Sequence, residues 1–333
     1  MAGLSDLPKK GVKREAELEI SSLTDTIQIE EVPSLVEQEW YQRACQFLER
    51  TLGQLSTEVK LDLNEGELLI EEIVQAHVQG ILPQELLVQA LHTEVASSSF
   101  LITNPVNVTV YAILVGTTLG LPTERLLELG LAALLHDAGK ILIPEEILYK
   151  QGTLNAEELK VIRRYPDESF EILRSLDTHY HYVAECAFHV NERLDGSGYP
   201  QGLLGDEINS YAQIIGILDV YEALTHNRPQ RPKFTHFEAV KLILKTQRQA
   251  FRREFLKALL NTLSIFPIYS YVKLNTGSIG RVIQTNGANP LRPKIEIIVD
   301  AQNRRVQDPR TIDLREQPIL YVVDAVEEAN LIV

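Results

Sequence analysis

The sequence contains little cysteine, no excess of positive charge and no long hydrophobic run. Only two of its 333 residues are cysteines, Cys45 and Cys186, too few for a disulfide framework or a zinc knuckle, which indicates a reducing compartment. The formal net charge of −14 argues against nucleic acid as a partner. The N-terminus lacks the apolar core of a signal peptide, and the longest apolar run, Val108–Leu121, is too short and too often interrupted to span a membrane. We therefore expect a soluble cytoplasmic protein without a membrane partner.

The spacing of apolar residues changes once along the chain. Up to Leu263 they recur at helical spacing, whereas from Phe266 onward short β-branched or alternating runs are separated by Asn-Thr-Gly and Asn-Gly turns. This pattern predicts a mainly α protein, a helical bundle followed by a small C-terminal β module. The expected organisation is a mobile tail (residues 1–33), an N-terminal helical region (34–99), a helical domain (100–263) and the β module (264–333).

Local signals predict where several elements begin and end. Asn104 followed by Pro105 is a favourable N-cap and first-turn pair, which predicts a helix over Val106–Leu119. A last long helix is expected over Thr235–Leu263. The strands of the β module are expected at Tyr271–Leu274, Ser278–Gln284, Lys294–Asp300 and Ile319–Val323.

An adjacent His-Asp pair ends the apolar helical run Leu126–Leu135. His136 and Asp137 are followed by Gly139, which we expect in the left-handed conformation that stops a helix, and by Lys140 on the same face as His136. An imidazole, a carboxylate and an ammonium group at one helix end can hold a divalent cation and a phosphate together. The alternative is a helix end whose polar side chains only satisfy one another, because two residues are a weak motif.

Four motifs follow one another in a specific order. They are Leu134–Lys140, Asn191–Pro200, Asp219–Leu224 and Arg228–Arg231. With these motifs, residues 95–262 resemble the HD-GYP family, a bacterial branch of the HD phosphohydrolases. The resemblance implies an HD-type helical bundle. It also implies, for active members, hydrolysis of cyclic di-GMP with two or three bound metal ions, usually iron or manganese.

Four positions at which the family carries histidines hold other residues in this chain. They are Asn104, Tyr165, Val190 and Asn191. The last three belong to the second metal; valine has no donor atom, a neutral phenol is a poor ligand, and one amide cannot hold a transition metal alone. We therefore expect no second metal ion. The neighbouring His189 is a weak replacement, because it lies about 100° around a helix from the first lost histidine.

The ligands that remain belong to the first metal position. His136, Asp137 and Asp219 could hold one divalent cation, Mg²⁺, Mn²⁺ or iron, at low occupancy, with the amide oxygen of Asn104 as a weak fourth ligand. The other expectation is no cofactor, with His136, Asp137 and Lys140 as the remnant of a catalytic site. Asp219 has a second interpretation, because a carboxylate in an apolar helix can instead form a buried salt bridge or hydrogen bond, with Lys140 as the candidate partner.

The glycine loop and two arginines are the candidate ligand-binding residues. The resemblance implies that Gly198, Tyr199 and Pro200 lie by the substrate mouth, and that Arg228 and Arg231 meet phosphate oxygens. The loop can instead serve backbone shape, with Tyr199 as a packing anchor, and the arginines can belong to a solvated surface. The candidate partners are a cyclic di-nucleotide, a diguanylate cyclase or another signalling protein, and a second copy of the chain.

These features predict a catalytically impaired HD-GYP-like domain that acts as a binding or regulatory module in bacterial cyclic di-nucleotide signalling. Two alternatives stay open. Retained His136, Asp137 and Lys140 favour a metal-dependent phosphohydrolase, of the cyclic di-GMP phosphodiesterase type, that works with a single metal ion. A structural scaffold would bind neither metal nor nucleotide.

Overall fold

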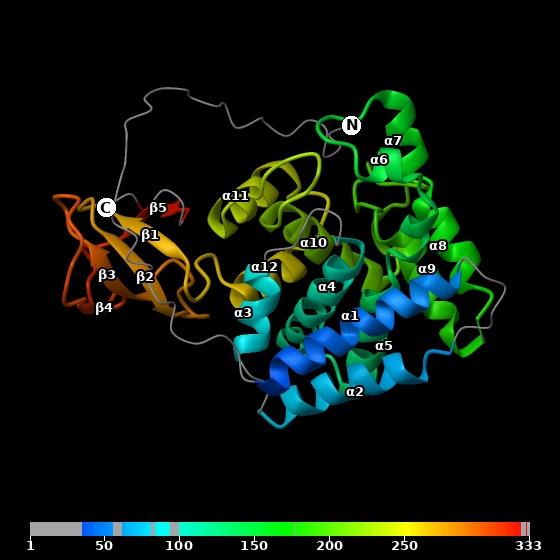
Figure 1. The fold of residues 1–333 in the computed structure, drawn as a ribbon, viewed down its shortest axis with the longest axis horizontal. Helices are drawn as coiled ribbons and strands as arrows, with labels where there is room; N and C mark the ends of the chain where they lie inside the picture. Colours follow the sequence, from blue (N-terminus) through cyan, green and yellow to red (C-terminus); the bar gives the residue numbers. More distant parts are fainter. Residues whose placement is uncertain are drawn as a thin grey trace, which may run out of the picture.

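A computed structural model describes residues 35–55, 62–80, 84–93, 100–176, 178–327 and 331. A body of helices and a small antiparallel sheet lie side by side, with the sheet at one end of the long axis (Figure 1). This confirms the predicted fold class, mainly α with a C-terminal β module. The tail expected over residues 1–33 lies outside the described residues.

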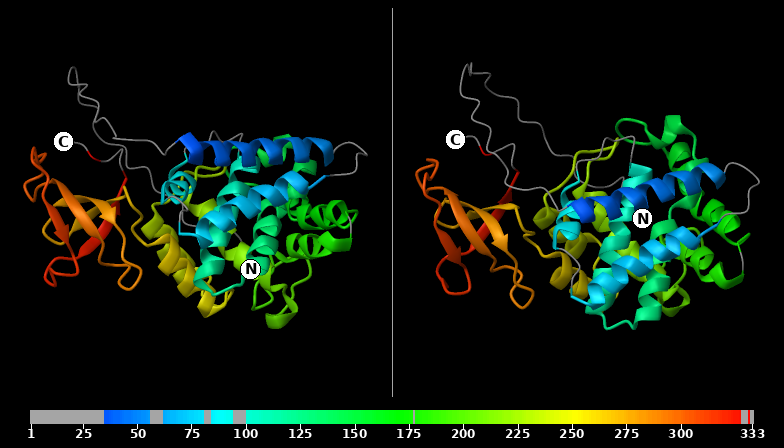
Figure 2. Two further views of the ribbon diagram at one scale, coloured as in Figure 1. Left: turned by 90° about the horizontal axis from the view of Figure 1, so that it is seen from below. Right: turned by 60° about the horizontal axis from the view of Figure 1, so that its bottom comes forward.

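The first half of the helical body is built around one apolar helix. α4 (Phe100–Thr118) contacts the helices on several sides of it, and α1 and α2 lie side by side on one face of the body (Figures 1 and 2). By length and composition α4 could cross a membrane, but 78% of its apolar window is buried among the other elements. The further helices of this half are α1 (Leu35–Leu55), α2 (Asn64–Val78), α3 (Gln84–His92) and α5 (Thr123–Leu135).

The second half begins with short elements and ends with longer helices. Several of them start where a side chain caps the first turn: Asn155 before α7, Asn209 before α10 and Thr235 before α11 accept hydrogen bonds from backbone N–H groups of their first turns. The elements are the 3₁₀ helix η2 (Ala138–Leu142), α6 (Glu145–Leu148), α7 (Ala156–Ile162), α8 (Tyr165–Leu173), η3 (Thr178–Tyr180), α9 (His181–His189), η4 (Gly205–Glu207), α10 (Ser210–Thr225), α11 (His236–Thr246) and α12 (Arg253–Leu263).

The helix that carries Asn104 begins earlier than the sequence predicted. α4 starts at Phe100, so Asn104 and Pro105 lie inside the helix and Asn104 is not its N-cap. Phe100 and Leu101 are buried in a small apolar cluster. Their burial offsets the one backbone hydrogen bond that the proline cannot donate. The prediction was wrong because tertiary contacts outweigh the local capping signal.

Two further local predictions were wrong. Gly139 lies in η2 and has no left-handed conformation. Glycine is required there by close approach, because a Cβ would lie 2.3 Å from the carbonyl oxygen of Tyr165 and 2.4 Å from the backbone nitrogen of Ser169. The long helix expected over Thr235–Leu263 is instead two helices, α11 and α12, separated by a turn whose Phe251 is buried in the core.

The sheet is antiparallel throughout, with the strand order β4-β3-β2-β1-β5. Alternate residues of its central strands face a small core of their own around Phe266. Three strands were predicted to within a residue or two at either end. The strand expected over Ile319–Val323 lies later, and β4 is too short to be recognised by its pattern. The strands are β1 (Tyr271–Leu274), β2 (Ile279–Gln284), β3 (Lys294–Val299), β4 (Thr311–Asp313) and β5 (Val322–Val326).

Candidate functional site

The His-Asp pair lies where α5 ends, and both side chains are buried. α10 brings Asp219 to the same place, because α10 packs against both α4 and α5. One ligand atom each from His136, Asp137 and Asp219 lie within 4.8 Å of one another. Within the described ranges these are the only histidine, cysteine or carboxylate side chains that form such a group. The expected first metal position is therefore assembled in the fold.

The imidazole of His136 has one nitrogen engaged and one without a partner. Nδ1 lies 2.7 Å from the carbonyl oxygen of Ala133, which can only accept, so Nδ1 carries the hydrogen. Nε2 is buried without a hydrogen bond, 3.4 Å from Oδ1 of Asp137 and 3.8 Å from Oδ1 of Asp219. Burial lowers the pKa of His136, but the charges of Asp137 and Asp219 outweigh it and raise the pKa above its ordinary value. Either a proton or a cation suits this position.

Positively charged groups lie against the carboxylates of the site. Lys140 donates a short hydrogen bond to Oδ2 of Asp137, and its ammonium group lies 4.8 Å from the centre of the Tyr165 ring. The other oxygen of Asp137, Oδ1, is buried without a hydrogen bond. Burial alone would raise the pKa of Asp219, but Lys140, His136 and Arg228 hold it well below the usual range. The hydrogen bond of Lys140 goes to Asp137, whereas one of the two interpretations of Asp219 had considered Lys140 as the partner of Asp219.

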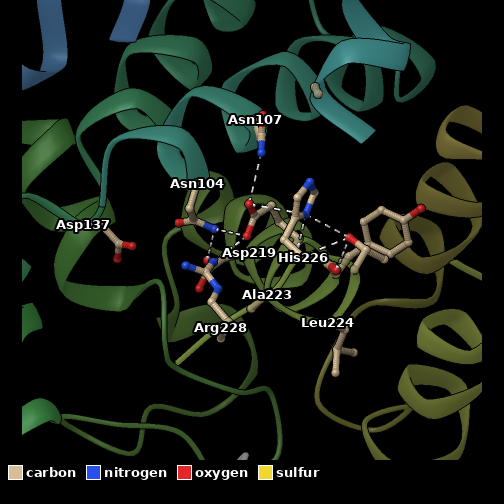
Figure 3. Close-up of polar contacts among 12 residues, drawn as sticks. Asn104, Asn107, Asp137, Asp219, Ala223, Leu224, His226 and Arg228 are labelled. Carbon is tan, nitrogen blue, oxygen red and sulfur yellow. Dashed lines mark hydrogen bonds and ion pairs between the residues drawn. The ribbon is translucent and has the colours of Figure 1, made fainter. Parts of the chain in front are cut away.

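Asn104 faces this group from α4. Its Nδ2 donates to Oδ1 of Asp219 at 3.0 Å and to Oε2 of Glu222 at 2.6 Å (Figure 3). Its Oδ1 is buried without a hydrogen bond and points to the side on which Asp137 lies (Figure 3). Three buried atoms without partners thus occur in the site, one each on Asn104, His136 and Asp137. A divalent cation would satisfy such donor atoms, so the residues present fit one.

Glu222 is a site residue that the sequence analysis missed. Its carboxylate is buried and accepts from Asn107 Nδ2 at 3.1 Å and from Arg228 at 2.5 Å, besides Asn104. Burial alone would raise the pKa of Glu222, but Arg228 and His226 bring it below the ordinary value. The available signal was its spacing of three from Asp219, which places both carboxylates on one face of α10.

Of the three residues at the positions where the sequence analysis expected no second metal, two pair with each other. Asn191 Nδ2 donates to the hydroxyl of Tyr165 at 2.6 Å. The apolar Val190, which precedes Asn191 in the chain, is also buried. Burial and the charge of Asp137 hold the pKa of Tyr165 well above its usual range, so the phenol stays neutral. His189 accepts a hydrogen bond from the backbone N–H of Asn209 on Nδ1.

The segment that follows the glycine loop is held by a second buried glutamate that the sequence analysis also missed. Glu192 accepts hydrogen bonds from the backbone N–H groups of residues 201–203, at 2.7, 3.1 and 3.0 Å. Gly198 packs so closely that a Cβ would lie 2.4 Å from the backbone of Glu192 and of Arg193. Tyr199, which precedes Pro200, lies with its ring 5.3 Å from the guanidinium of Arg163. Both the loop's shape and one cation-aromatic contact are thus in place.

The two candidate phosphate-binding arginines have protein partners. Arg228 bonds to Glu222 and lies over the ring of Phe100 at 4.7 Å. Arg231 donates to the carbonyl oxygens of Ala223 and Leu224, which lie in the last turn of α10 and have no partners within the helix. Burial, with the charge of Arg228, lowers the pKa of Arg231 to about 10. A phosphate would have to compete with these contacts.

Two family models and several known proteins are similar to this chain. The model of the HD domain family matches residues 86–254, and the model of a KOW domain associated with the HD domain matches residues 271–333. A cyclic di-GMP phosphodiesterase of Pseudomonas aeruginosa is 31% identical over 196 residues, which are 59% of this chain and 47% of the relative. A cyclic di-GMP phosphodiesterase of Borreliella burgdorferi is 29% identical over 221 residues, 66% of this chain and 56% of the relative. The chain thus spans about half the length of these relatives.

A solved structure shares the fold. It is that of an HDG"Y"P protein from Bdellovibrio bacteriovorus, which aligns with a TM-score of 0.53 and 17% sequence identity over 71% of this chain and 73% of that one. The helical architecture around the buried group of His136, Asp137 and Asp219 is therefore one that known proteins also adopt.

Proposed function

The chain belongs to the HD domain family, in its HD-GYP branch, and from that premise we propose that it is a catalytically impaired module that binds a cyclic di-nucleotide. Its role would be regulation in cyclic di-nucleotide signalling, with little or no hydrolysis of the ligand. The two relatives described above are named as cyclic di-GMP phosphodiesterases, which supports the ligand class.

The pairing of Tyr165 with Asn191 carries the proposal of impairment. The amide of Asn191 donates to the hydroxyl oxygen of Tyr165, and Val190, the residue before Asn191, has no atom that could bind a metal. A second cation would have no set of ligands here. In two-metal sites the paired cations activate the attacking water and stabilise the charge that develops on the phosphodiester, each role contributing several kcal/mol. We therefore propose that this chain lacks most of that stabilisation.

The first position is different, because its donor set suits one hard cation. One imidazole nitrogen and the oxygens of two carboxylates and an amide match the preferences of Mn²⁺ and, more weakly, Mg²⁺. A cation bound there would polarise a phosphate oxygen of the ligand. His136 Nε2 and Asp137 Oδ1 would hold it, and Lys140 would keep the other oxygen of Asp137 in place.

A second candidate function is a phosphohydrolase that works with this single cation. The observation in its favour is the retention of a buried His136 and Asp137 whose facing atoms lack hydrogen bonds, since a site without function has no need for them. A pure scaffold, the third candidate, would need neither a cation nor a nucleotide.

Binding and hydrolysis of cyclic di-GMP by the same protein preparation separate these functions. We expect saturable binding of cyclic di-GMP in the presence of Mn²⁺, with turnover at least about a thousandfold below that of the Pseudomonas aeruginosa relative. Turnover within tenfold of that relative by protein that holds about one Mn²⁺ per chain, abolished in Asp219→Asn, would establish the single-cation enzyme. Neither binding nor turnover would leave the scaffold.

The partner proteins stay proposals of the same kind. A diguanylate cyclase or another signalling protein, and a second copy of this chain, are the candidates. Sedimentation of the purified chain, alone and with a diguanylate cyclase domain, tests both. Sedimentation of this chain as a monomer in both experiments would contradict them.

A further inference from the structure

Glu222 lies one turn after Asp219 on α10 and is fully buried, yet it is not part of the ligand group. We propose that Glu222 is a positioning residue: it orients the amide of Asn104 so that the carbonyl oxygen of Asn104 faces the cation. This inference rests on the single-cation site proposed above. In this role Glu222 touches no cation and sets the affinity of the site for the cation through Asn104.

The orientation of the Asn104 amide follows from its two hydrogen bonds. Both hydrogens of Nδ2 go to carboxylates, one to Asp219 at 3.0 Å and one to Glu222 at 2.6 Å. A rotation of the amide by 180° would place its oxygen at these distances from two anionic oxygens, which repel it. Oδ1 is therefore turned to the opposite side, where it is buried without a hydrogen bond and faces the side of Asp137 (Figure 3).

Glu222 is better suited than Asp219 to hold this orientation when a cation is bound. Asp219 would share its negative charge with the cation and become a weaker acceptor, whereas Glu222 keeps its charge for its hydrogen bonds. Its carboxylate is itself held by two further side chains, one of which is held by a third. Arg228 bonds to one oxygen and Asn107 to the other, and Asn107 in turn accepts the hydroxyl hydrogen of Tyr41 from α1 at 2.6 Å.

A change of Glu222 to glutamine removes this preference with little change in volume. The glutamine can place an NH₂ group where Oε2 was, with loss of the hydrogen bond from Arg228, and the rotated amide of Asn104 then finds a donor. In that rotated form an NH₂ group, which cannot bind a cation, faces the site. The effect on the cation therefore passes through Asn104 and requires it.

The test is a double-mutant cycle on the full chain, with Mn²⁺ affinity measured by calorimetry. Glu222→Gln should weaken Mn²⁺ binding by about tenfold, as removal of supporting residues around a metal site does. Asn104→Leu should weaken it by a similar factor. In the Asn104→Leu background, Glu222→Gln should have no further effect. Glu128→Gln, which changes another hydrogen-bonded glutamate, on α5, should leave Mn²⁺ affinity unchanged.

The outcomes separate this inference from the site on which it rests. No Mn²⁺ binding by the wild type, or full binding by Asp219→Asn, would refute the cation site. Loss of binding in Asp219→Asn with unchanged affinity in Glu222→Gln would refute only the role of Glu222, as would independent, multiplicative effects in the double mutant. Glu222→Asp keeps the negative charge but withdraws from Asn104 the oxygen that it shares with Arg228, so the same cycle can be run with it if the glutamine variant does not fold.

Discussion

Because η2 and α8 are in close contact at Gly139, we expect a substitution of this glycine to destabilise the fold. Replacing Gly139 by alanine would place a Cβ 2.3 Å from the carbonyl oxygen of Tyr165 and 2.4 Å from the backbone nitrogen of Ser169. Both are backbone atoms, so no rotation of a side chain can relieve the contact. The backbone N–H of Gly139 also donates to Oγ of Ser169 at 2.8 Å, a bond that would be lost if the helices separate.

The expected destabilisation follows from these two effects. Overpacking in a tight contact costs about 1 to 3 kcal/mol, and loss of one hydrogen bond costs about 1 kcal/mol. Gly139→Ala should therefore lower the free energy of unfolding by about 2 to 4 kcal/mol. Because the displaced helix carries Tyr165 and η2 follows the His-Asp pair directly, Mn²⁺ affinity should fall as well.

Urea denaturation followed by circular dichroism measures this change, and the chain offers a matched control. Gly53 lies in α1, and a Cβ there would meet nothing within 4 Å. Gly53→Ala should be neutral or stabilise the protein by about 0.5 kcal/mol, since alanine is the better helix former. Equal unfolding free energies for the two variants would refute the close-contact explanation of Gly139.

Three further predictions follow from the site and the core. Asn104→His, which supplies an imidazole, should raise the affinity for Ni²⁺ or Zn²⁺ relative to Mg²⁺ by at least about tenfold in competition titrations, and an unchanged ratio would contradict a ligand role for position 104. Histidines introduced together at Tyr165, Val190 and Asn191 should raise the bound transition metal from about one to about two per chain, measured by plasma mass spectrometry; a folded variant that still binds one would show that more than ligands is missing. Burial, together with Glu49, raises the pKa of the Cys45 thiol to about 12, so at pH 8 its reaction with a disulfide reagent should be about a thousandfold slower than that of free cysteine until urea unfolds the protein, and rapid labelling of the native protein would contradict this.

Much of the fold could be predicted because local signals and tertiary structure agree. The caps at Asn209 and Thr235 act within their own first turns, so the starts of α10 and α11 are readable from a few neighbouring residues. The change from helical to alternating spacing after Leu263 marks the β module for the same reason. Where tertiary contacts decide, the local signal misleads: Asn104 before Pro105 resembles a helix start, but its amide is used by side chains 115 and 118 residues away.

The candidate site was predictable in its ligands and not in its supporting residues. His136, Asp137 and Asp219 could be named from the motifs, and the fold brings them together. The roles of Glu222 and Glu192 could not, because each depends on which groups converge on a buried carboxylate. For Glu222 these are two asparagines and an arginine from other segments, and for Glu192 three backbone N–H groups of the next loop.

The metal content of the purified chain tests the central claim most directly. Plasma mass spectrometry on protein prepared without chelator or affinity metal counts the ions, with Asp219→Asn as the control that removes a proposed ligand. The account predicts at most one divalent cation per chain in the wild type, rising to about one when Mn²⁺ is supplied, and none in the variant. Two tightly bound transition metals per chain would contradict it, because Tyr165, Val190 and Asn191 would then have to be replaced by ligands from elsewhere in the chain.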